Sequence, residues 1–404
     1  MSRTIITIAA AAMMSAALLL SPISASARRC DDKPPETLMS LYRKSAAIHI
    51  GRFERVEDFA IVEQGEDFTV VQVRKHYSIS STLKGTPQQS FFTQEDEYRY
   101  AETGADEEFI DEHSYGMVKL EPGDAVMLFT MADPETGMTV LTDYADAVKK
   151  LDADEMSAYT SRVEELNSLF AEGEPSEAAA LRWILKAIED PITRWEGAYE
   201  LLSGVQYLEW KKDRDANIVE KTAKGEKIEE WELEDNYYYE DTFNNSGYAK
   251  LLSERDRQRL VDILVSSEPA PIAKDGEYSR VAEGEAALTD LVSRWADRRV
   301  ADHLVSQIRR GGQPYYRMGH LMEIVAKALE NSELRSLGEK YAEIYYEDDE
   351  PITAETGVQA PIDPQTGQPV KAATFGELRR WVLDRFLEKS DVLLTTASAE
   401  QPSN

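Results

Sequence analysis

Carboxylates are the side chains whose abundance could support chemistry in this 404-residue chain, which has 75 Asp and Glu residues against 45 Lys and Arg. Several carboxylate oxygens together can hold a hard cation such as Ca²⁺. Two acidic stretches are candidate cation sites, namely Asp106, Glu107, Glu108 and Asp111, and Glu347, Asp348 and Asp349. The first stretch lacks the Asp-x-Asp-x-Asp-Gly spacing of a calcium loop, which favours a solvated loop. The second falls at the expected C-terminal end of a helix, where negative charge is unfavourable unless a cation or a basic partner offsets it.

Aromatic residues alternate with carboxylates between residues 226 and 241, a pattern typical of surfaces that bind glycans or other partners. The candidate contact residues are Trp231, Tyr237, Tyr238 and Tyr239. The competing interpretation is a segment that packs these rings back onto neighbouring helices.

Cys30 is the single cysteine, so an intramolecular disulfide and a multi-thiolate zinc site are excluded. It is a candidate interaction residue near the expected start of the mature chain. A catalytic role is not indicated, because no histidine lies nearby in the sequence to act as its base.

Sequence patterns of catalysis are missing elsewhere as well. The chain has no Gly-x-Ser-x-Gly elbow, no His-Glu-x-x-His helix, no phosphate-binding glycine loop and no dinucleotide fingerprint. The sequence therefore favours a protein without catalytic activity and without a cofactor, apart from a Ca²⁺ ion at the acidic stretches. A carboxylate-dependent hydrolase stays open as an alternative, because paired carboxylates need no sequence motif.

The formal net charge of −30 bears on the class of partner. It opposes binding to nucleic acid, since no segregated basic patch is visible to meet the phosphates. A protein partner or another basic surface is expected instead, with binding that weakens as salt increases.

The first 27 residues have the features of a secretory signal peptide: Arg3, an apolar run over residues 5–20, Pro22 and the small residues 25–27. An N-terminal membrane anchor is the alternative. Because no later apolar run approaches ~18 residues, we expect no transmembrane segment after signal removal. The expected location is secreted or periplasmic.

The elements that must position these residues differ between the two halves of the chain. Strand signals occur at residues 46–53, 67–79, 90–94, 124–131 and 138–143, and five strands in about 100 residues fit a small β-barrel or sandwich as the domain over residues 28–150.

The order of these features resembles the netrin/TIMP-like OB barrel of metalloprotease inhibitors. The matching features are a cysteine after the signal, the segment AAIHIGRF at residues 46–53, a long second strand that reaches Leu83-Lys84-Gly85, and LEPGD at residues 120–124 before an apolar strand. The resemblance covers roughly residues 30–145. It implies an OB-like fold and an alternative function as a protease inhibitor, in which an N-terminal cysteine chelates the protease zinc through its amine and carbonyl.

After residue 152 the apolar period changes to 3.6, as for Leu181, Ile184, Leu185 and Ile188. The Asp190-Pro191 break between two such patterns resembles a HEAT-type hairpin. We expect a helical-hairpin domain over residues 151–350, a linker at 351–373, a C-terminal helix at 374–389 and a disordered tail at 390–404. The predicted fold class is therefore α+β and multidomain: a five-stranded OB-like barrel followed by an α-helical solenoid or bundle.

Together these features predict an exported, acidic, non-enzymatic interaction protein. Its partner, a protein or a cationic surface, would bind through the barrel loops or the solenoid surface.

Overall fold

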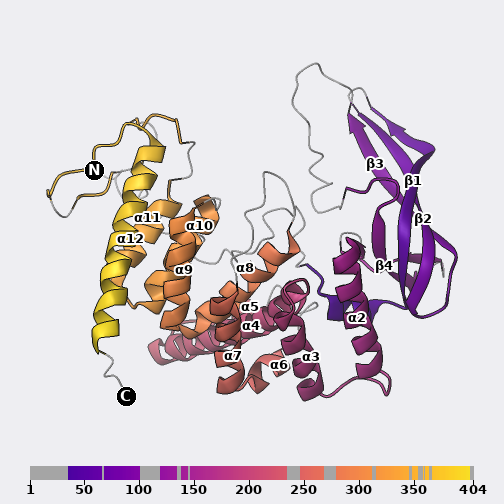
Figure 1. The fold of residues 1–404 in the computed structure, drawn as a ribbon, viewed down its shortest axis with the longest axis horizontal. Coiled ribbons are helices and arrows are strands. Elements are labelled where there is room, and N and C mark those ends of the chain that lie inside the picture. Colours follow the sequence, from indigo (N-terminus) through magenta and orange to yellow (C-terminus); the bar gives the residue numbers. More distant parts are fainter. Residues whose placement is uncertain are drawn as a thin grey trace.

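The computed structural model describes residues 35–65, 68–100, 119–133, 138–143, 146–233, 246–267, 279–311, 315–344, 348–353, 358, 360–363 and 366–400. Strands fill the first part of this range and helices the second, so the predicted α+β class is confirmed. In Figure 1 the sheet stands at one end of the long axis and the last helices stand at the other.

The sheet part begins with the short helix α1 (Leu38–Lys44), in which Thr37 caps the first turn by accepting a hydrogen bond from the Ser40 N–H. The strands are β1 (Ala47–Gln64), β2 (Phe68–Lys84), β3 (Ser90–Tyr100), β4 (Ala125–Ala132), β5 (Thr139–Leu141) and β6 (Val148–Lys150). They pair antiparallel in the order β3-β2-β1-β4-β5, and β6 also pairs with β4.

This sheet corrects the expected five strands to six. β6 was not predicted because two of its three residues are lysines, a residue type depleted in strands. Among the described residues no pairing joins β3 to β5, so the sheet is open there and closure into a barrel is not observed.

β1 and β2 are much longer than the other strands, and their pairing contains several register shifts. Such bulges increase the local twist of a strand pair. β4 covers β1 only from Ala47 to Arg52. Beyond that point β1, β2 and β3 continue as a three-stranded extension that we call the distal ribbon: residues 54–64 of β1, 68–76 of β2 and 92–100 of β3.

The helical part contains α2 (Ala153–Leu169), α3 (Glu177–Glu189), α4 (Arg194–Lys224), α5 (Glu230–Leu233), α6 (Ser246–Leu251), α7 (Glu254–Ser266), α8 (Arg280–Val292), α9 (Arg298–Arg310), α10 (Tyr315–Ala328), α11 (Ser332–Ala342) and α12 (Phe375–Glu400), with a 3₁₀ helix (Ser293–Trp295) after α8. Local signals start several of these helices. Asp152 and Glu155 form a capping box before α2, and Ser253 and Asp256 form one before α7. Gly225, with φ of 70°, ends α4 in the left-handed region.

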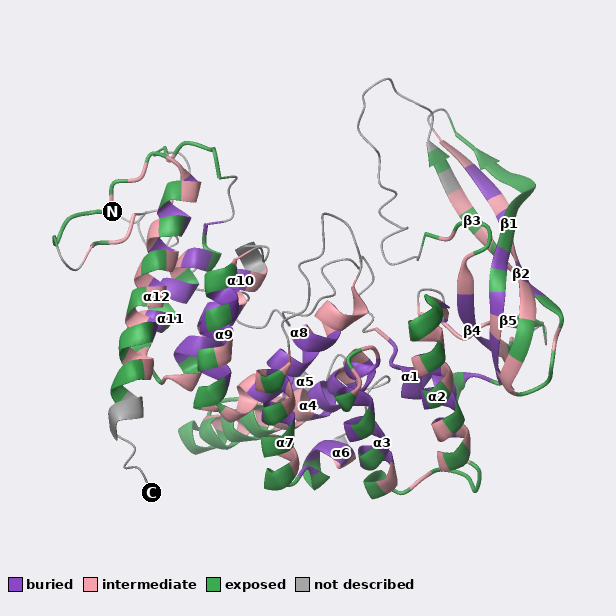
Figure 2. Ribbon diagram, in the orientation of Figure 1, coloured by how far each residue is buried: buried purple, intermediate pink, exposed green. Residues whose placement is uncertain are grey.

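Consecutive helices pack on one another in the pairs α3–α4, α9–α10 and α10–α11, while α8 returns to pack on α4. Their facing sides are buried (Figure 2). One apolar core runs from α1 and the base of the sheet, through Ile48 and Phe129, to Phe386 in α12. A smaller core of Phe53, Tyr77, Phe91, Val126 and Leu128 lies within the sheet.

The C-terminal helix is longer than expected. α12 continues to Glu400 rather than ending at residue 389, so residues 390–400 of the expected disordered tail are helical, and Leu393 and Leu394 pack against the main core. The segment expected as a linker has its ends side by side, since Pro351 bridges to Thr374. α12 packs directly on α11.

Candidate functional site

Among the described residues, one backbone edge of β1 has no neighbouring strand along the distal ribbon. The last contacts on that edge are at Phe53, whose N–H donates to the Asp124 carbonyl at 2.9 Å and whose carbonyl accepts from the Gly123 N–H at 2.8 Å. From residue 54 to residue 64 no strand of the described chain pairs with β1 on that side. Alternate N–H and C=O groups along this edge are thus available for pairing.

Large apolar side chains are exposed along the same ribbon. Their exposed fractions lie between 44% and 66%, and the residues are Val56, Phe59, Ile61, Val62 and Phe92. Four of the five belong to β1. At the base of the same strand pair, by contrast, Phe53 and Tyr77 are buried. Single exposed apolar residues are normal on protein surfaces, whereas four of them within seven residues of one strand indicate a contact surface.

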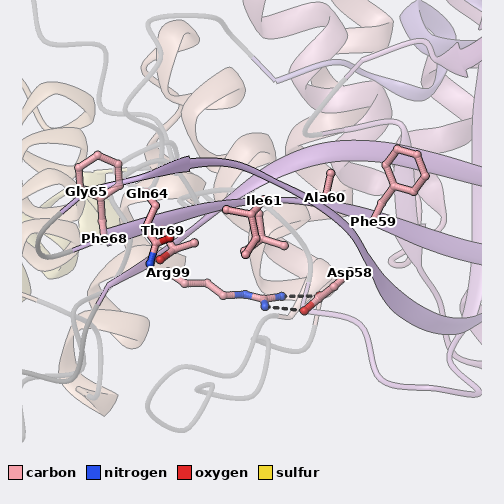
Figure 3. Close-up of a pocket in the computed structure, with 10 residues that line it drawn as sticks. Asp58, Phe59, Ala60, Ile61, Gln64, Gly65, Phe68, Thr69 and Arg99 are labelled. Atoms are coloured by element: carbon pink, nitrogen blue, oxygen red, sulfur yellow. Dashed lines mark hydrogen bonds and ion pairs between the residues drawn. The ribbon is translucent and has the colours of Figure 1, made fainter.

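One face of the ribbon is hollowed into an open cavity of about 730 Å³, lined in part by Ile61, Phe68 and Val71 (Figure 3). An ion pair crosses the ribbon beside it: the Arg99 guanidinium donates to both oxygens of Asp58 at 2.7 and 2.8 Å. These hydrogen bonds hold the pKa of the Asp58 carboxyl below its ordinary value. In Figure 3 Ile61 points to the side of this pair, and Phe59 points to the opposite side.

The other face carries an aromatic and cationic stack. The Arg74 guanidinium carbon lies 3.5 Å from the centre of the Phe59 ring and 5.3 Å from that of Phe92. Gln94 accepts a hydrogen bond from Arg74 Nε at 3.1 Å, which fixes the guanidinium. The stack joins the three strands while about half of each phenyl side chain stays exposed.

Charge on the free edge is predominantly negative. Residues 54–64 contain four carboxylates and one guanidinium, a net charge of −3. In the described part of the chain, the distal ribbon therefore combines an unpaired backbone edge, exposed apolar side chains and acidic groups, an arrangement suited to binding another chain.

A second group of polar residues is buried where α1 meets α4. Glu196 and Glu200, one turn apart on α4, are about 1% exposed and face the start of α1. Glu196 accepts hydrogen bonds from the Leu38 N–H at 2.5 Å and the Tyr159 hydroxyl at 2.7 Å, and Lys149 Nζ lies 3.1 Å away.

Glu200 accepts a hydrogen bond from the Thr37 hydroxyl. Burial raises the pKa of Glu200 to about 7, with the nearby Glu196 and Glu36 acting in the same direction. Both carboxylates are enclosed by protein groups and hold α1 and the base of the sheet on the helical part. Their position favours a structural role.

A third polar group lies between α8 and α10. Asp290 accepts a hydrogen bond from Arg317 Nη1 at 3.1 Å, and His320 Nε2 lies 2.7 Å from the same oxygen. Burial raises the pKa of Asp290, but Arg317 and His320 lower it more, so its pKa is below the ordinary value. A carboxylate can orient a catalytic imidazole in this way. Among the described residues, however, no Ser, Thr or Cys side chain bonds to His320, so no nucleophile completes the pair.

Most residues proposed from the sequence lie outside the described residues: Cys30, Asp106, Glu107, Glu108, Asp111, Tyr237, Tyr238, Tyr239 and Glu347. Trp231 lies in α5, but its side chain is not described. The cation site and the aromatic contact surface therefore remain predictions.

Asp348 and Asp349 are described. Arg379 of α12 donates from Nε to Asp348 at 3.0 Å and from Nη1 to the Ile344 carbonyl at 3.0 Å. The charge of Asp348 is thus offset by a basic side chain of the same protein. Within the described parts of the chain, no three His, Cys, Asp or Glu side chains come together as a metal site.

The distal ribbon was missed by the sequence interpretation, which ended the first strand at residue 53. The available signal was the set of strand-forming residues Val56, Phe59, Ile61 and Val62 before the turn at Gln64-Gly65, although Glu57, Asp58 and Ala60 between them weaken it. The expected alternation is weak there because every side chain from residue 54 to residue 64 is exposed.

Comparison with protein-family models, curated proteins and solved structures finds no match to this chain. None of the helices in the described stretches is both long and apolar enough to cross a bilayer.

Proposed function

We propose that this protein is an exported, acidic, non-enzymatic interaction protein that binds a basic partner protein through its distal ribbon. The observation that carries the proposal is the set of exposed apolar residues on a strand with one edge that no described strand pairs. Burying such a surface would remove apolar area from water and pair free backbone groups, the two main sources of affinity in strand-mediated contacts.

The negative charge supports the choice of a basic partner. The whole chain has a net charge of −30, and residues 54–64 contribute −3 at the contact itself. A field of this sign raises the association rate with basic proteins and lowers it with acidic ones. The signal-like residues 1–27 support a secreted or periplasmic location.

The alternatives carry less support from the described residues. Inhibition of a metalloprotease would depend on Cys30, which lies outside them, and the buried Glu196 and Glu200 are engaged in holding α1. The OB-like resemblance of the sheet and the HEAT-like resemblance of the helices stay predictions.

A capture experiment with matched variants tests the proposal. The full chain, a Phe59→Ser/Ile61→Ser variant and a Val219→Ser variant are incubated with envelope and secreted extracts, and bound proteins are identified by mass. Val219 is a suitable control because it is 69% exposed but lies on α4. We expect a saturable basic protein that the ribbon variant loses and the control retains. Equal capture by both variants would refute a role for the distal ribbon.

A further inference from the structure

We infer that the free edge of β1, residues 54–64, accepts an extended segment of the partner protein as an additional antiparallel or parallel strand, and that this segment alternates basic and aliphatic residues. The inference rests on the proposed function and specifies how the partner is recognised.

The free edge of β1 continues the edge of the same strand to which β4 is already paired. β4 pairs with β1 from Ala47 to Arg52, and the hydrogen bonds of Phe53 with residues 123 and 124 extend this coverage by one residue. An added strand on residues 54–64 would lie in line with β4. Eleven residues of edge correspond to roughly 35 Å, which is enough for a strand of ordinary length.

Exposed apolar side chains occur beside this edge, where β1 presents Val56, Phe59, Ile61 and Val62. Since side chains of a paired strand meet those of its neighbour on each face, aliphatic residues of the added strand would cover the exposed β1 residues. The open cavity beside Ile61 and Val71 can receive one such side chain.

Charge selects a basic segment over a second copy of this chain. Pairing two copies through this edge would bring together eight carboxylates and two guanidiniums, and each chain carries a net charge of −30. Glu63, which has no ion-pair partner among the described residues, lies near the tip and is available to a Lys or Arg of the incoming strand. Opposite charges across neighbouring strands stabilise the pair, whereas like charges oppose it.

A peptide titration tests the inference directly. The probe is a fluorescently labelled ten-residue peptide that alternates Lys and Val, added to the full chain at low salt and followed by anisotropy. Two matched peptides control for its components. One is identical but methylated on every backbone nitrogen, so that it keeps charge and side chains and loses its N–H donors, and the other alternates Glu and Val. Hydrogen exchange of β1 amides is measured with and without the probe.

We expect the methylated peptide to bind at least tenfold more weakly and the acidic peptide to show no binding. The Lys-Val peptide should slow hydrogen exchange at alternate residues between 54 and 64. Glu63→Lys should weaken binding several-fold, while Glu226→Lys, an equal charge change on the exposed loop after α4, should have little effect. The peptide effect should decrease as salt increases.

Equal binding of the methylated peptide, or no binding of the Lys-Val peptide, would overturn the inference. A second result would also overturn it: hydrogen exchange at residues 54–64 that becomes slower as protein concentration rises, in the absence of peptide. The edge would then be occupied by a second copy of this chain. None of these results would contradict a positive capture experiment, so the proposed function could still hold. Conversely, capture that is unaffected by Phe59→Ser/Ile61→Ser would refute the proposed function, whichever peptide binds.

Discussion

Single residues at the junction of α1 and α4 make the stability of this protein sensitive to pH. The pKa of Glu200 is about 7 in the folded chain because of burial, against an ordinary value of 4.5. Between these values the folded protein keeps a proton that the unfolded chain has released. The stabilisation is therefore complete below pH 4.5 and is lost as the pH rises through 7.

Glu200→Gln should remove this dependence while preserving an acceptor for the Thr37 hydroxyl. The difference in pKa corresponds to about 3 kcal/mol. When the pH is raised from 4.5 to 8, the unfolding free energy of the wild type should therefore fall by about 3 kcal/mol more than that of the variant. Urea denaturation at several pH values measures the effect. Glu220→Gln, an exposed position on α4, is the control. Parallel pH profiles for wild type and Glu200→Gln would contradict the assignment.

Asp290 has the opposite pH dependence, because its pKa is lowered in the folded chain by Arg317 and His320. Asp290→Asn should destabilise the protein by about 3 kcal/mol at pH 7, since it leaves a mostly buried guanidinium without its counter-charge. The difference from wild type should shrink as the pH falls below the ordinary Asp value of 3.8. Denaturation at pH 7 and pH 3 measures both effects, with Asp302→Asn on the exposed side of α9 as control. A constant difference would argue against a charge effect.

At the scale of elements, the boundary between strands and helices near residue 150 was predictable, because the apolar period changes there from 2 to 3.6. β6 ends at Lys150 and α2 begins at Ala153. The strand ends were less predictable: β1 runs on to Gln64 although its distal half has no buried face to impose alternation. The candidate site lies in that half, so the sequence interpretation missed it.

α9 lies within the helical part expected over residues 151–350, and its Val300, Leu304 and Ile308 recur at the helical spacing. α12 was predicted too short. Residues 390–404 were expected to be a disordered tail, but Leu393 and Leu394 pack against the core and the helix continues to Glu400. Tertiary packing, which the sequence pattern indicates only weakly, set the length of α12.

Two helix glycines test how closely the elements pack. A Cβ at Gly197 in α4 would lie 2.5 Å from the Ile184 carbonyl oxygen of α3, whereas a Cβ at Gly338 in α11 would meet its neighbours at 3.4 Å or more. Gly197→Ala should therefore cost about 2 kcal/mol of unfolding free energy by forcing α3 and α4 apart. Gly338→Ala should add up to about 1 kcal/mol, because Ala favours the helix. Thermal or urea denaturation of the two variants measures these changes in unfolding free energy. Equal changes for both variants would refute the close contact at Gly197.

At the scale of the whole molecule, the sheet and the helices share one core while the distal ribbon stands outside it. Leu38, Met39 and Leu41 of α1 are fully buried and belong to the same cluster as Ile48 of β1 and Phe386 of α12. The polar groups that hold α1, Glu196 and Glu200, come from the helical part. The free edge can therefore be available for a partner while the remainder of the protein stays rigid.

This arrangement predicts that the base of the sheet and the helices unfold together. Leu38→Ala removes a fully buried side chain of α1 and should lower the unfolding free energy by about 3 kcal/mol. Because the core is continuous, the loss should be equal for slowly exchanging amides in residues 47–53 of β1 and in α10, as read by native-state hydrogen exchange. Phe92 is a half-exposed residue of the distal ribbon, so Phe92→Ala should change the exchange free energies of these two sets of amides by less than about 0.5 kcal/mol. Loss of protection in the sheet alone after Leu38→Ala would show that the two parts unfold separately and that α1 belongs only to the sheet.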